Sequence, residues 1–178
     1  IANMTENGAY LLKAGEIEKL KNIVLVSKDN KYDINKKWVG RDASKILKEL
    51  GIASNARLII CETDNMHPFV QLELMMPILP IVRVKDINEA IAMAVQAEHG
   101  NRHTAHIHSK NIDNLTSFAR AIETTIFVKN APSYAGIGAG GEGYATFTIA
   151  GPTGEGLTSA RSFTRQRRCV MADGLHIV

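Results

Sequence analysis

Residues 78–129 read ILPIVRVKDINEAIAMAVQAEHGNRHTAHIHSKNIDNLTSFARAIETTIFVK, and apolar runs alternate along them with amphipathic stretches. Three short runs rich in β-branched or alternating residues predict strands, at 78–84, 104–109 and 125–129. The two intervening stretches, 86–98 and 111–123, have the apolar spacing of helices. This alternation of strands and helices indicates an α/β fold with parallel crossovers.

Both helices have recognisable start signals. Asp86 and Asn111 stand where their side chains can cap a helix N-terminus, and Gly100 is placed to end the first helix. The stripe expected to face inward in the first helix consists of Ile87, Ala90, Ile91, Ala94 and Val95. The stripe of the second helix consists of Ile112, Leu115, Phe118, Ala119 and Ile122.

The flanking regions give further predictions. Before residue 78 we expect helices over 16–21 and 43–50, strands over 23–26 and 57–61, and a charged loop over 30–37. After residue 130 we expect a glycine-rich segment over 132–156 that contains one short strand, 144–149. Asp173-Gly174 predicts a terminal hairpin of strands 169–171 and 175–178, which would offer an edge to another chain.

The composition indicates a globular protein of the cytoplasm. The 178 residues are 45% hydrophobic and 22% charged, which excludes a disordered chain, a fibre and a disulfide-stapled miniprotein. No run of about 18 apolar residues is present, so we expect no membrane span, and the first residues lack a signal-peptide pattern. Cys61 and Cys169 have no CxxC partner, which fits a reducing compartment. The net charge of +3 is too small to indicate nucleic acid by itself.

A glycine-rich string follows the last predicted strand. Residues 136–141, GIGAGG, satisfy the GxGxxG pattern of dinucleotide-binding loops. That motif needs a helix after the glycines to hold the pyrophosphate, but here the glycines lead into the β-like residues 144–147. We therefore favour a tight loop whose backbone packs closely under a ligand or a neighbouring segment.

Four histidines crowd into ten residues: His99, His103, His106 and His108. On a strand, His106 and His108 would share a face at a spacing that could bind zinc. No carboxylate or cysteine joins them at ligand spacing, so we expect surface histidines and no metal site. His103 and Thr104 enter a strand, where functional groups of α/β folds gather, and both a structural and an active-site role stay open.

Three further features have two interpretations each. Glu73 precedes an apolar run, 74–77, and could be an exposed loop charge or a buried acceptor for hydroxyl groups. Cys61 and Cys169 have no base placed by the sequence, so we interpret them as packing residues rather than nucleophiles. The basic patch 161–168 could bind phosphate or RNA, but few aromatic residues interleave, so we favour ion pairs at a subunit contact. Its arginines are Arg161, Arg165, Arg167 and Arg168.

Several motifs remain to be explained: QLELMMPILP at 71–80, EAI at 89–91, HGNRHTA at 99–105, IFVKN at 126–130, GGEG at 140–143, PTGEGLTSAR at 152–161 and RRCV at 167–170. The first two resemble the aldehyde dehydrogenase superfamily. The others resemble its CoA-acylating members, and among these the propionaldehyde and acetaldehyde enzymes of bacterial microcompartments. The resemblance implies a three-layer, open, mostly parallel sheet with flanking helices and a C-terminal β tail. It makes residues 1–156 a portion of the catalytic domain and residues 157–178 an oligomerisation tail.

The resemblance also implies a reaction. NAD oxidises a short aldehyde bound to a cysteine, and coenzyme A takes the acyl group from the resulting thioester. Glu73 matches the carboxylate that holds the nicotinamide ribose hydroxyls, and Met75 stands where an apolar side chain packs near the nicotinamide. His103 and Thr104 are typical of acylating members and are candidate accessory residues. A homo-oligomer and a microcompartment shell are the implied partners.

One departure from the family bears on activity. The nucleophilic cysteine and the nucleotide-binding domain of the family lie before the matched region, so the resemblance places them upstream of Ile1. We therefore expect residues 1–178 alone to be inactive. The alternatives are an assembly fragment without catalysis and a phosphate- or RNA-binding module that uses the patch 161–168.

Overall fold

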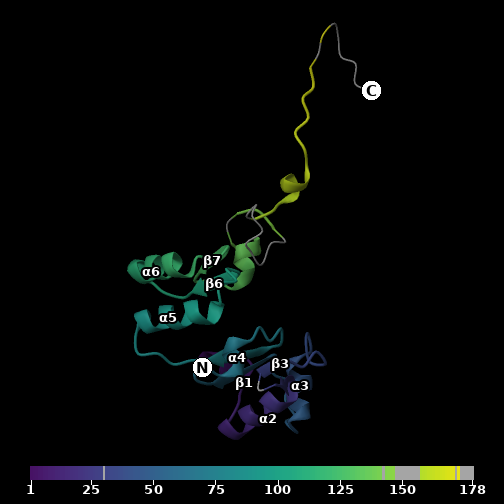
Figure 1. Cartoon of the computed structure of the whole chain (residues 1–178), viewed down its shortest axis with the longest axis vertical. Coiled ribbons are helices and arrows are strands. Elements are labelled where there is room, and N and C mark those ends of the chain that lie inside the picture. The colour runs from purple at the N-terminus through teal and green to yellow at the C-terminus, as the bar shows by residue number, and fades with distance from the viewer. Residues whose placement is uncertain (30, 142, 147–156, 171, 173–178) are drawn as a thin grey trace. The chain divides into compact units, whose positions relative to one another are not determined.

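The computed structural model describes residues 1–29, 31–141, 143–146, 157–170 and 172 (Figure 1). The chain divides into two compact units, Ile1–Met93 and Ala94–Val178. The first unit contains α1 (Ala2–Glu6), β1 (Ala9–Leu11), α2 (Ala14–Val24), β2 (Leu25–Lys28), β3 (Lys31–Ile34), α3 (Ala43–Glu49), β4 (Leu58–Glu62), α4 (Pro68–Gln71) and β5 (Ile78–Ile81). The boundary between the units falls within α5 (Ile87–Glu98). The second unit contains β6 (Thr104–Ile107), α6 (Ile112–Ile122), β7 (Ile126–Lys129) and the 3-10 helices η1 (Ser133–Ile137) and η2 (Ala160–Phe163).

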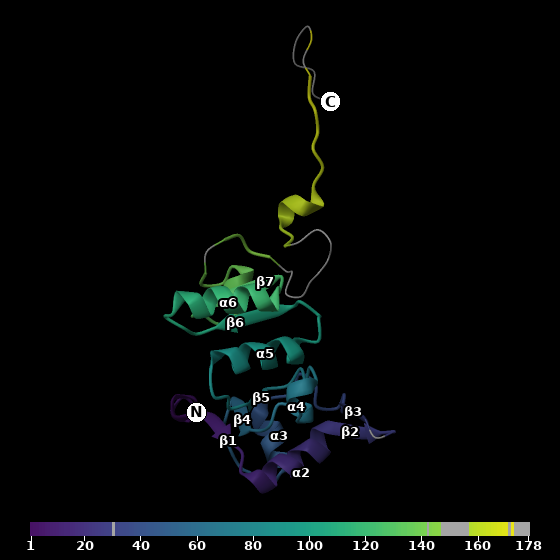
Figure 2. The ribbon, with the colours of Figure 1, turned by 60° about the vertical axis from the view of Figure 1, so that its left-hand side comes forward.

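A parallel sheet organises the first unit. Its strand order is β1-β4-β5 (Figure 2). Ile59 of β4 lies opposite Ile78 of β5. Both pairings are parallel, and helices connect the strands, as in other α/β sheets. The predicted α/β class, with parallel strands and flanking helices, is therefore confirmed.

The core of this unit lies where α2 and α3 pack on β4. Its fully buried members are Leu20 and Val24 of α2, Ile46 and Leu47 of α3, and Ile59 and Cys61 of β4. Ile59 and Cys61 are two residues apart and therefore share a face of the strand. The predicted helix over 43–50 is confirmed, and Gly51, with a left-handed φ of +77°, follows its end.

Two predictions in this unit are wrong. Residues 23 and 24 continue α2, because Leu20 and Val24 repeat at the four-residue spacing of one buried helix face. The segment 30–37, predicted as a charged loop, contains β3, which pairs antiparallel with β2. The side chains of Lys31, Tyr32 and Asp33 are exposed, so this edge strand buries too little apolar surface to show a strand pattern.

The second unit has a parallel strand pair. β6 pairs with β7, with Thr104 opposite Ile126, and α6 connects them. The Oδ1 of Asn111 accepts the N–H groups of Asp113 and Asn114 at 2.8 and 3.2 Å, which confirms the predicted cap. Leu115, Phe118 and Ile122 are buried as predicted, but Ile112 and Ala119 are exposed. Phe118 packs edge to face on Phe127 of β7, with ring centroids 5.6 Å apart, so this side of α6 faces the strand pair.

The stripe predicted for α5 is only partly buried. Asp86 Oδ1 accepts the N–H of Glu89 at 2.9 Å, which confirms the predicted helix start. No residue of α5 is fully buried, and the Val95 side chain is 40% exposed. The dividing point between the two compact units, after Met93, falls inside this helix.

The glycine-rich loop packs on its own unit. A Cβ at Gly136 would lie 2.2 Å from Cγ2 of Ile126, and Gly138 has a φ of +91° with the Ala145 backbone against it. The predicted close approach to a neighbouring segment is confirmed. No α-helix follows the loop in the described residues.

The strands predicted at 144–149 and 169–171 are wrong in their described residues. Residues 144–146 form no strand, and 147–149 lie outside the described residues. Cys169 and Val170 also lie outside any strand, and both are exposed. Of the rest of the predicted hairpin, residues 171 and 173–178 lie outside the described residues. Among the described residues, no helix is long and apolar enough to cross a membrane.

Candidate functional site

Glu73 and Met75 lie on the segment between α4 and β5, and both side chains are exposed. Their neighbours Leu72, Leu74 and Met76 pack on the core instead. This alternation places a carboxylate and a thioether next to each other on the outer side of an extended segment. The Glu73 carboxylate makes no hydrogen bond or ion pair with any described part of the chain, so its two oxygens are free to accept hydroxyl donors.

The backbone around Met75 is fixed in an uncommon conformation. Met75 has a φ of +52°, and its carbonyl accepts the N–H of Gly40 at 3.0 Å. A left-handed non-glycine residue costs on the order of 1–3 kcal/mol and persists where the surroundings hold it. The Met75 side chain remains 65% exposed. The fold therefore holds an apolar side chain outward, in the manner of a contact surface for a ligand.

A cavity of about 600 Å³ opens beside Met75 in the first unit. Its lining combines the apolar Met75 and Pro77 with the polar Arg41, Asp42, Ser44 and Arg57. Such a mixture suits a ligand that has both a flat apolar ring and polar groups. Glu73 is two residues from this lining.

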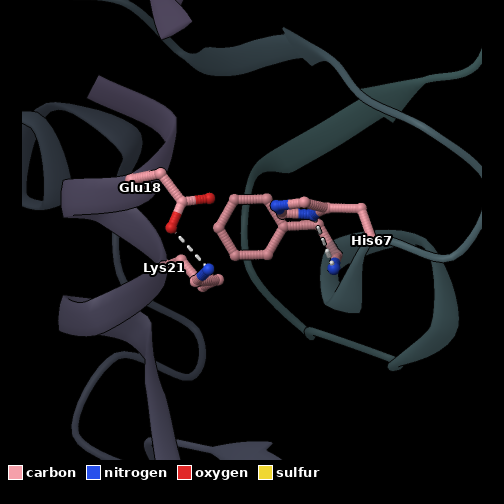
Figure 3. Close-up of polar contacts among 4 residues, drawn as sticks. Glu18, Lys21 and His67 are labelled. Atoms are coloured by element: carbon pink, nitrogen blue, oxygen red, sulfur yellow. Dashed lines mark hydrogen bonds and ion pairs between the residues drawn. The ribbon is translucent and has the colours of Figure 1, made fainter. Parts of the chain in front are cut away.

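A second cavity of about 610 Å³ lies near the carboxyl ends of β4 and β5. Glu62 and Arg83 line it and form an ion pair, with Arg83 Nη2 3.1 Å from Glu62 Oε1. This bond from Arg83 holds the pKa of Glu62 below its usual range. Figure 3 shows the ion pair of Glu18 and Lys21 on α2, and His67 near this pair. Burial lowers the pKa of His67, and the Lys21 charge adds to this effect.

His103 and Thr104 stand at the start of β6 in the second unit, where the sequence places them. Both are half-buried. The N–H of His103 donates to Glu98 Oε1 at 3.1 Å, and its carbonyl accepts the N–H of Ile126 at 3.2 Å. These backbone bonds fix the position of His103, and they leave its ring available for a further role.

His106 and His108 are exposed on the second unit, as predicted. Their rings lie edge to face with centroids 5.7 Å apart, and His106 Nδ1 is 3.4 Å from the Ser133 hydroxyl. No group of three or more possible metal ligands occurs in the described residues. Two neighbouring histidines by themselves make a poor zinc site, which normally needs three or four protein ligands.

The sequence from residue 28 to residue 151 matches the model of the aldehyde dehydrogenase family. The chain belongs to that family. It is 51% identical over 174 residues to the acetaldehyde dehydrogenase (acetylating) EutE of Salmonella typhimurium, and 47% identical over 180 residues to a propanal dehydrogenase (CoA-propanoylating) of the same organism. These matches cover 96% and 99% of this chain, but 37% and 38% of the relatives. This aldehyde dehydrogenase chain thus spans somewhat over a third of their length.

Solved structures agree with the fold of this aldehyde dehydrogenase chain. A propionaldehyde dehydrogenase of Rhodopseudomonas palustris, solved with bound CoA and an acylated cysteine, has a TM-score of 0.85 and 53% identity, and the match covers 95% of this chain and 38% of that one. The propionaldehyde dehydrogenase of the Clostridium phytofermentans fucose utilisation microcompartment gives 0.83 and 55%, over 96% and 39% of the two chains. An engineered glycolyl-CoA reductase solved with NADP+ gives 0.85 and 53%, over 95% and 38%. The predicted resemblance to the CoA-acylating members is confirmed.

The two cysteines of this aldehyde dehydrogenase chain differ in their surroundings. Cys61 is fully buried in the core, and burial raises the pKa of its thiol to about 11. A thiol with that pKa is protonated at neutral pH, so Cys61 is a packing residue, as the sequence indicated. Cys169 is exposed. The patch 161–168 is exposed as well, and it includes Phe163, whose side chain is 82% exposed.

Sequence reasoning missed His67, which caps α4 in this aldehyde dehydrogenase chain. Its Nδ1 accepts the N–H of Phe69 at 3.2 Å. Histidine is not among the preferred N-cap residues, so the cap gave no signal. Pro68 at the first helical position was the signal that could have located α4.

Proposed function

We propose that this chain is the C-terminal catalytic part of a CoA-acylating aldehyde dehydrogenase that acts on propionaldehyde or acetaldehyde. The identity of 47–51% over nearly the whole chain to acetylating and CoA-propanoylating enzymes carries this proposal. In the proposed reaction, the aldehyde hydrogen leaves as hydride to NAD+, the carbonyl carbon bonds to the sulfur of coenzyme A, and the thiol proton is released. The products are acyl-CoA and NADH.

In this proposal, Glu73 accepts hydrogen bonds from the hydroxyl groups of the nicotinamide ribose. Its exposed carboxylate, without a partner in the described part of the chain, supports this role. Met75 packs against the nicotinamide ring, which its 65% exposed side chain supports. Together, one charged and one apolar contact would orient the cofactor, which supplies the hydride acceptor when bound.

The nucleophilic cysteine, in this proposal, belongs to a part of the protein outside this chain. The burial of Cys61 and its thiol pKa of about 11 support that view. His103 and Thr104 remain proposed accessory residues. Their half-buried place at the start of β6 supports a role next to a substrate rather than in the core.

The proposed setting is a homo-oligomer in the cytoplasm, inside a bacterial microcompartment. The similarity to an enzyme of a fucose utilisation microcompartment supports the setting. Residues 157–178 are proposed as the oligomerisation tail. Phe163 lies within the patch 161–168 and Val170 follows it. Their side chains are 82% and 78% exposed, which supports a contact that another chain covers.

The test is the rate of NADH formation by the intact protein that carries this chain, with propionaldehyde and NAD, with and without coenzyme A. We expect the steady-state rate to depend on coenzyme A, because its thiol removes the acyl group from the enzyme. An equal rate without coenzyme A would assign the protein to the hydrolytic aldehyde dehydrogenases. An absence of turnover under both conditions would favour an assembly role.

A further inference from the structure

His67 holds the first turn of α4 with its ring rather than with a hydroxyl or carboxylate oxygen. The N–H of Phe69 donates to His67 Nδ1 at 3.2 Å. Because a backbone N–H is the donor, Nδ1 carries no proton, and the neutral ring has its proton on Nε2. The cap therefore exists only in one protonation state of the histidine.

The surroundings of the ring fix this state. Nε2 is shielded from solvent and has no partner in the described residues, so a ligand in the neighbouring cavity cannot reach it as the side chains stand. The ring meets the Phe69 ring edge to face, with centroids 4.8 Å apart, and Phe69 is 2% exposed in the core. The charged groups around it are Glu18 and Lys21 on α2, Asp64 just after β4, and the Glu62–Arg83 pair that lines the same cavity.

α4 depends on these contacts because it has only four residues. A helix of one turn is not stable by itself in water. The His67 carbonyl accepts the N–H of Val70 at 2.8 Å, and the Pro68 carbonyl accepts the N–H of Leu72 at 3.0 Å. The cap and the buried Phe69 ring therefore fix where α4 begins, and the bond from Leu72 to Pro68 fixes where it ends and the next segment begins.

That next segment is the one that carries Glu73. It is fixed at its start by the bond from Leu72 to Pro68, and near its end by the bond from the Gly40 N–H to the Met75 carbonyl. Between these points, the buried Leu74 side chain sets the direction of its two neighbours. A displaced α4 would move the first fixed point, and Glu73 with it.

We propose that His67 is a positioning residue for the nicotinamide cofactor, which acts through α4 to hold Glu73 and Met75 against the nicotinamide riboside. The inference rests on the proposed function. His67 does not touch the cofactor in this proposal, but it contributes to the affinity for the cofactor through the position of Glu73 and Met75.

The experiment compares two variants in the intact protein, His67→Ala and His67→Asn. Asparagine keeps an oxygen that can accept the Phe69 N–H, whereas alanine has none. In the alanine variant we expect the KM for NAD to rise by between about twofold and about thirtyfold, the range for loss of one N-cap hydrogen bond, with kcat little changed. Hydrogen exchange at the Phe69 and Leu72 amides should accelerate by a similar factor. The asparagine variant should restore both values.

A pH series separates this role from a merely structural one. In the wild type, the KM for NAD should rise as acid protonates Nδ1 and breaks the cap, whereas in His67→Asn this rise should be absent. His108→Ala, which removes an exposed histidine of the second unit, is the matched control and should behave as the wild type. Equal pH dependence in wild type and His67→Asn would overturn the proposal.

Glu73→Gln separates a failure of the positioning role of His67 from a failure of the proposed role of Glu73. If Glu73→Gln raises the KM for NAD and His67→Ala leaves it unchanged, the positioning role is overturned and the proposed function stands. If Glu73→Gln has no effect on the KM, the proposed role of Glu73 is overturned and the positioning role falls with it. A rise in both variants, with faster exchange in His67→Ala, supports both.

Discussion

Phe69 binds the His67 ring twice: its backbone N–H donates to Nδ1 at 3.2 Å, and its own ring packs edge to face at a centroid distance of 4.8 Å. The hydrogen bond between the Phe69 N–H and His67 therefore depends on the protonation state of the histidine. α4 begins at this hydrogen bond, and the segment after α4 carries Glu73. Loss of the bond should therefore affect both the stability of α4 and the position of Glu73.

The free energy of unfolding should depend on pH through His67. Burial lowers the pKa of His67 in the folded protein, so the folded state prefers the neutral ring. This contribution is present above the ordinary histidine pKa of about 6.5 and is lost as the pH falls through the lower folded pKa. Urea unfolding between pH 8 and pH 5 should show a larger loss of stability in wild type than in His67→Asn. Parallel profiles would contradict this assignment.

Glu73→Gln should weaken the binding of the nicotinamide cofactor. An amide accepts hydroxyl hydrogen bonds less strongly than a carboxylate, so we expect the KM for NAD to rise by about tenfold or more. The control is Glu49→Gln, which changes an exposed glutamate on α3 and should leave the KM as it is. Steady-state kinetics in the intact protein, at saturating aldehyde and coenzyme A, measure both. A response of equal size in both variants would mean that Glu73 acts only through its general charge.

Cys61 and Cys169 should react very differently with a thiol reagent. The Cys61 thiol is buried and has a pKa of about 11, whereas Cys169 is exposed. Peptide mapping by mass spectrometry after brief alkylation at neutral pH should find Cys169 labelled and Cys61 unlabelled. Cys61→Ala should keep CoA-dependent turnover and lose about 1–2 kcal/mol of stability from the lost packing. Abolished turnover in a folded Cys61→Ala protein would make Cys61 the nucleophile instead.

Gly136→Ala should destabilise the second unit. The new methyl group would lie 2.2 Å from Cγ2 of Ile126 and 3.1 Å from Cγ2 of Val128, both on β7. Overpacking of this kind costs about 1–3 kcal/mol. Gly15→Ala is the matched control, because a Cβ there meets nothing within 4 Å, and it should be neutral or slightly stabilising in α2. In thermal unfolding, Gly136→Ala should have a lower Tm than Gly15→Ala. Equal Tm values would contradict the close packing of the loop.

Residues 1–178 by themselves should not oxidise aldehydes. Cys61 is protonated at neutral pH. In the proposed function, the nucleophile belongs to a part of the protein outside this chain. The isolated chain, mixed with propionaldehyde, NAD and coenzyme A, should give no NADH above the uncatalysed background. Turnover by this chain would overturn that expectation and direct attention to Cys169.

The elements that the sequence predicted best are those with a wide apolar face or a polar cap. Asn111 and the stripe of Leu115, Phe118 and Ile122 determine α6 locally, so its start and its buried side could be predicted. β3 could not, because its residues are polar and its pairing with β2 is set by the hairpin rather than by burial. β1 has three residues and is defined only by its parallel pairing with β4, which is a tertiary contact.

The candidate site was predictable in part for the same reason. The motif around Glu73 identified the residue, but its pattern left open whether the carboxylate is buried or exposed. In the structure the Glu73 carboxylate is exposed, because Leu72 and Leu74 occupy the inward-facing positions of an alternating segment. His67 gave no signal, since its role depends on a single proton position and on Phe69 being buried beside it.

The most direct test of the central claim is the ratio of acyl-CoA to NADH formed by the intact protein from propionaldehyde, NAD and coenzyme A. The account predicts one propionyl-CoA for each NADH, because the hydride and the acyl group come from the same aldehyde molecule. NADH accompanied by propionate, with no propionyl-CoA, would contradict it.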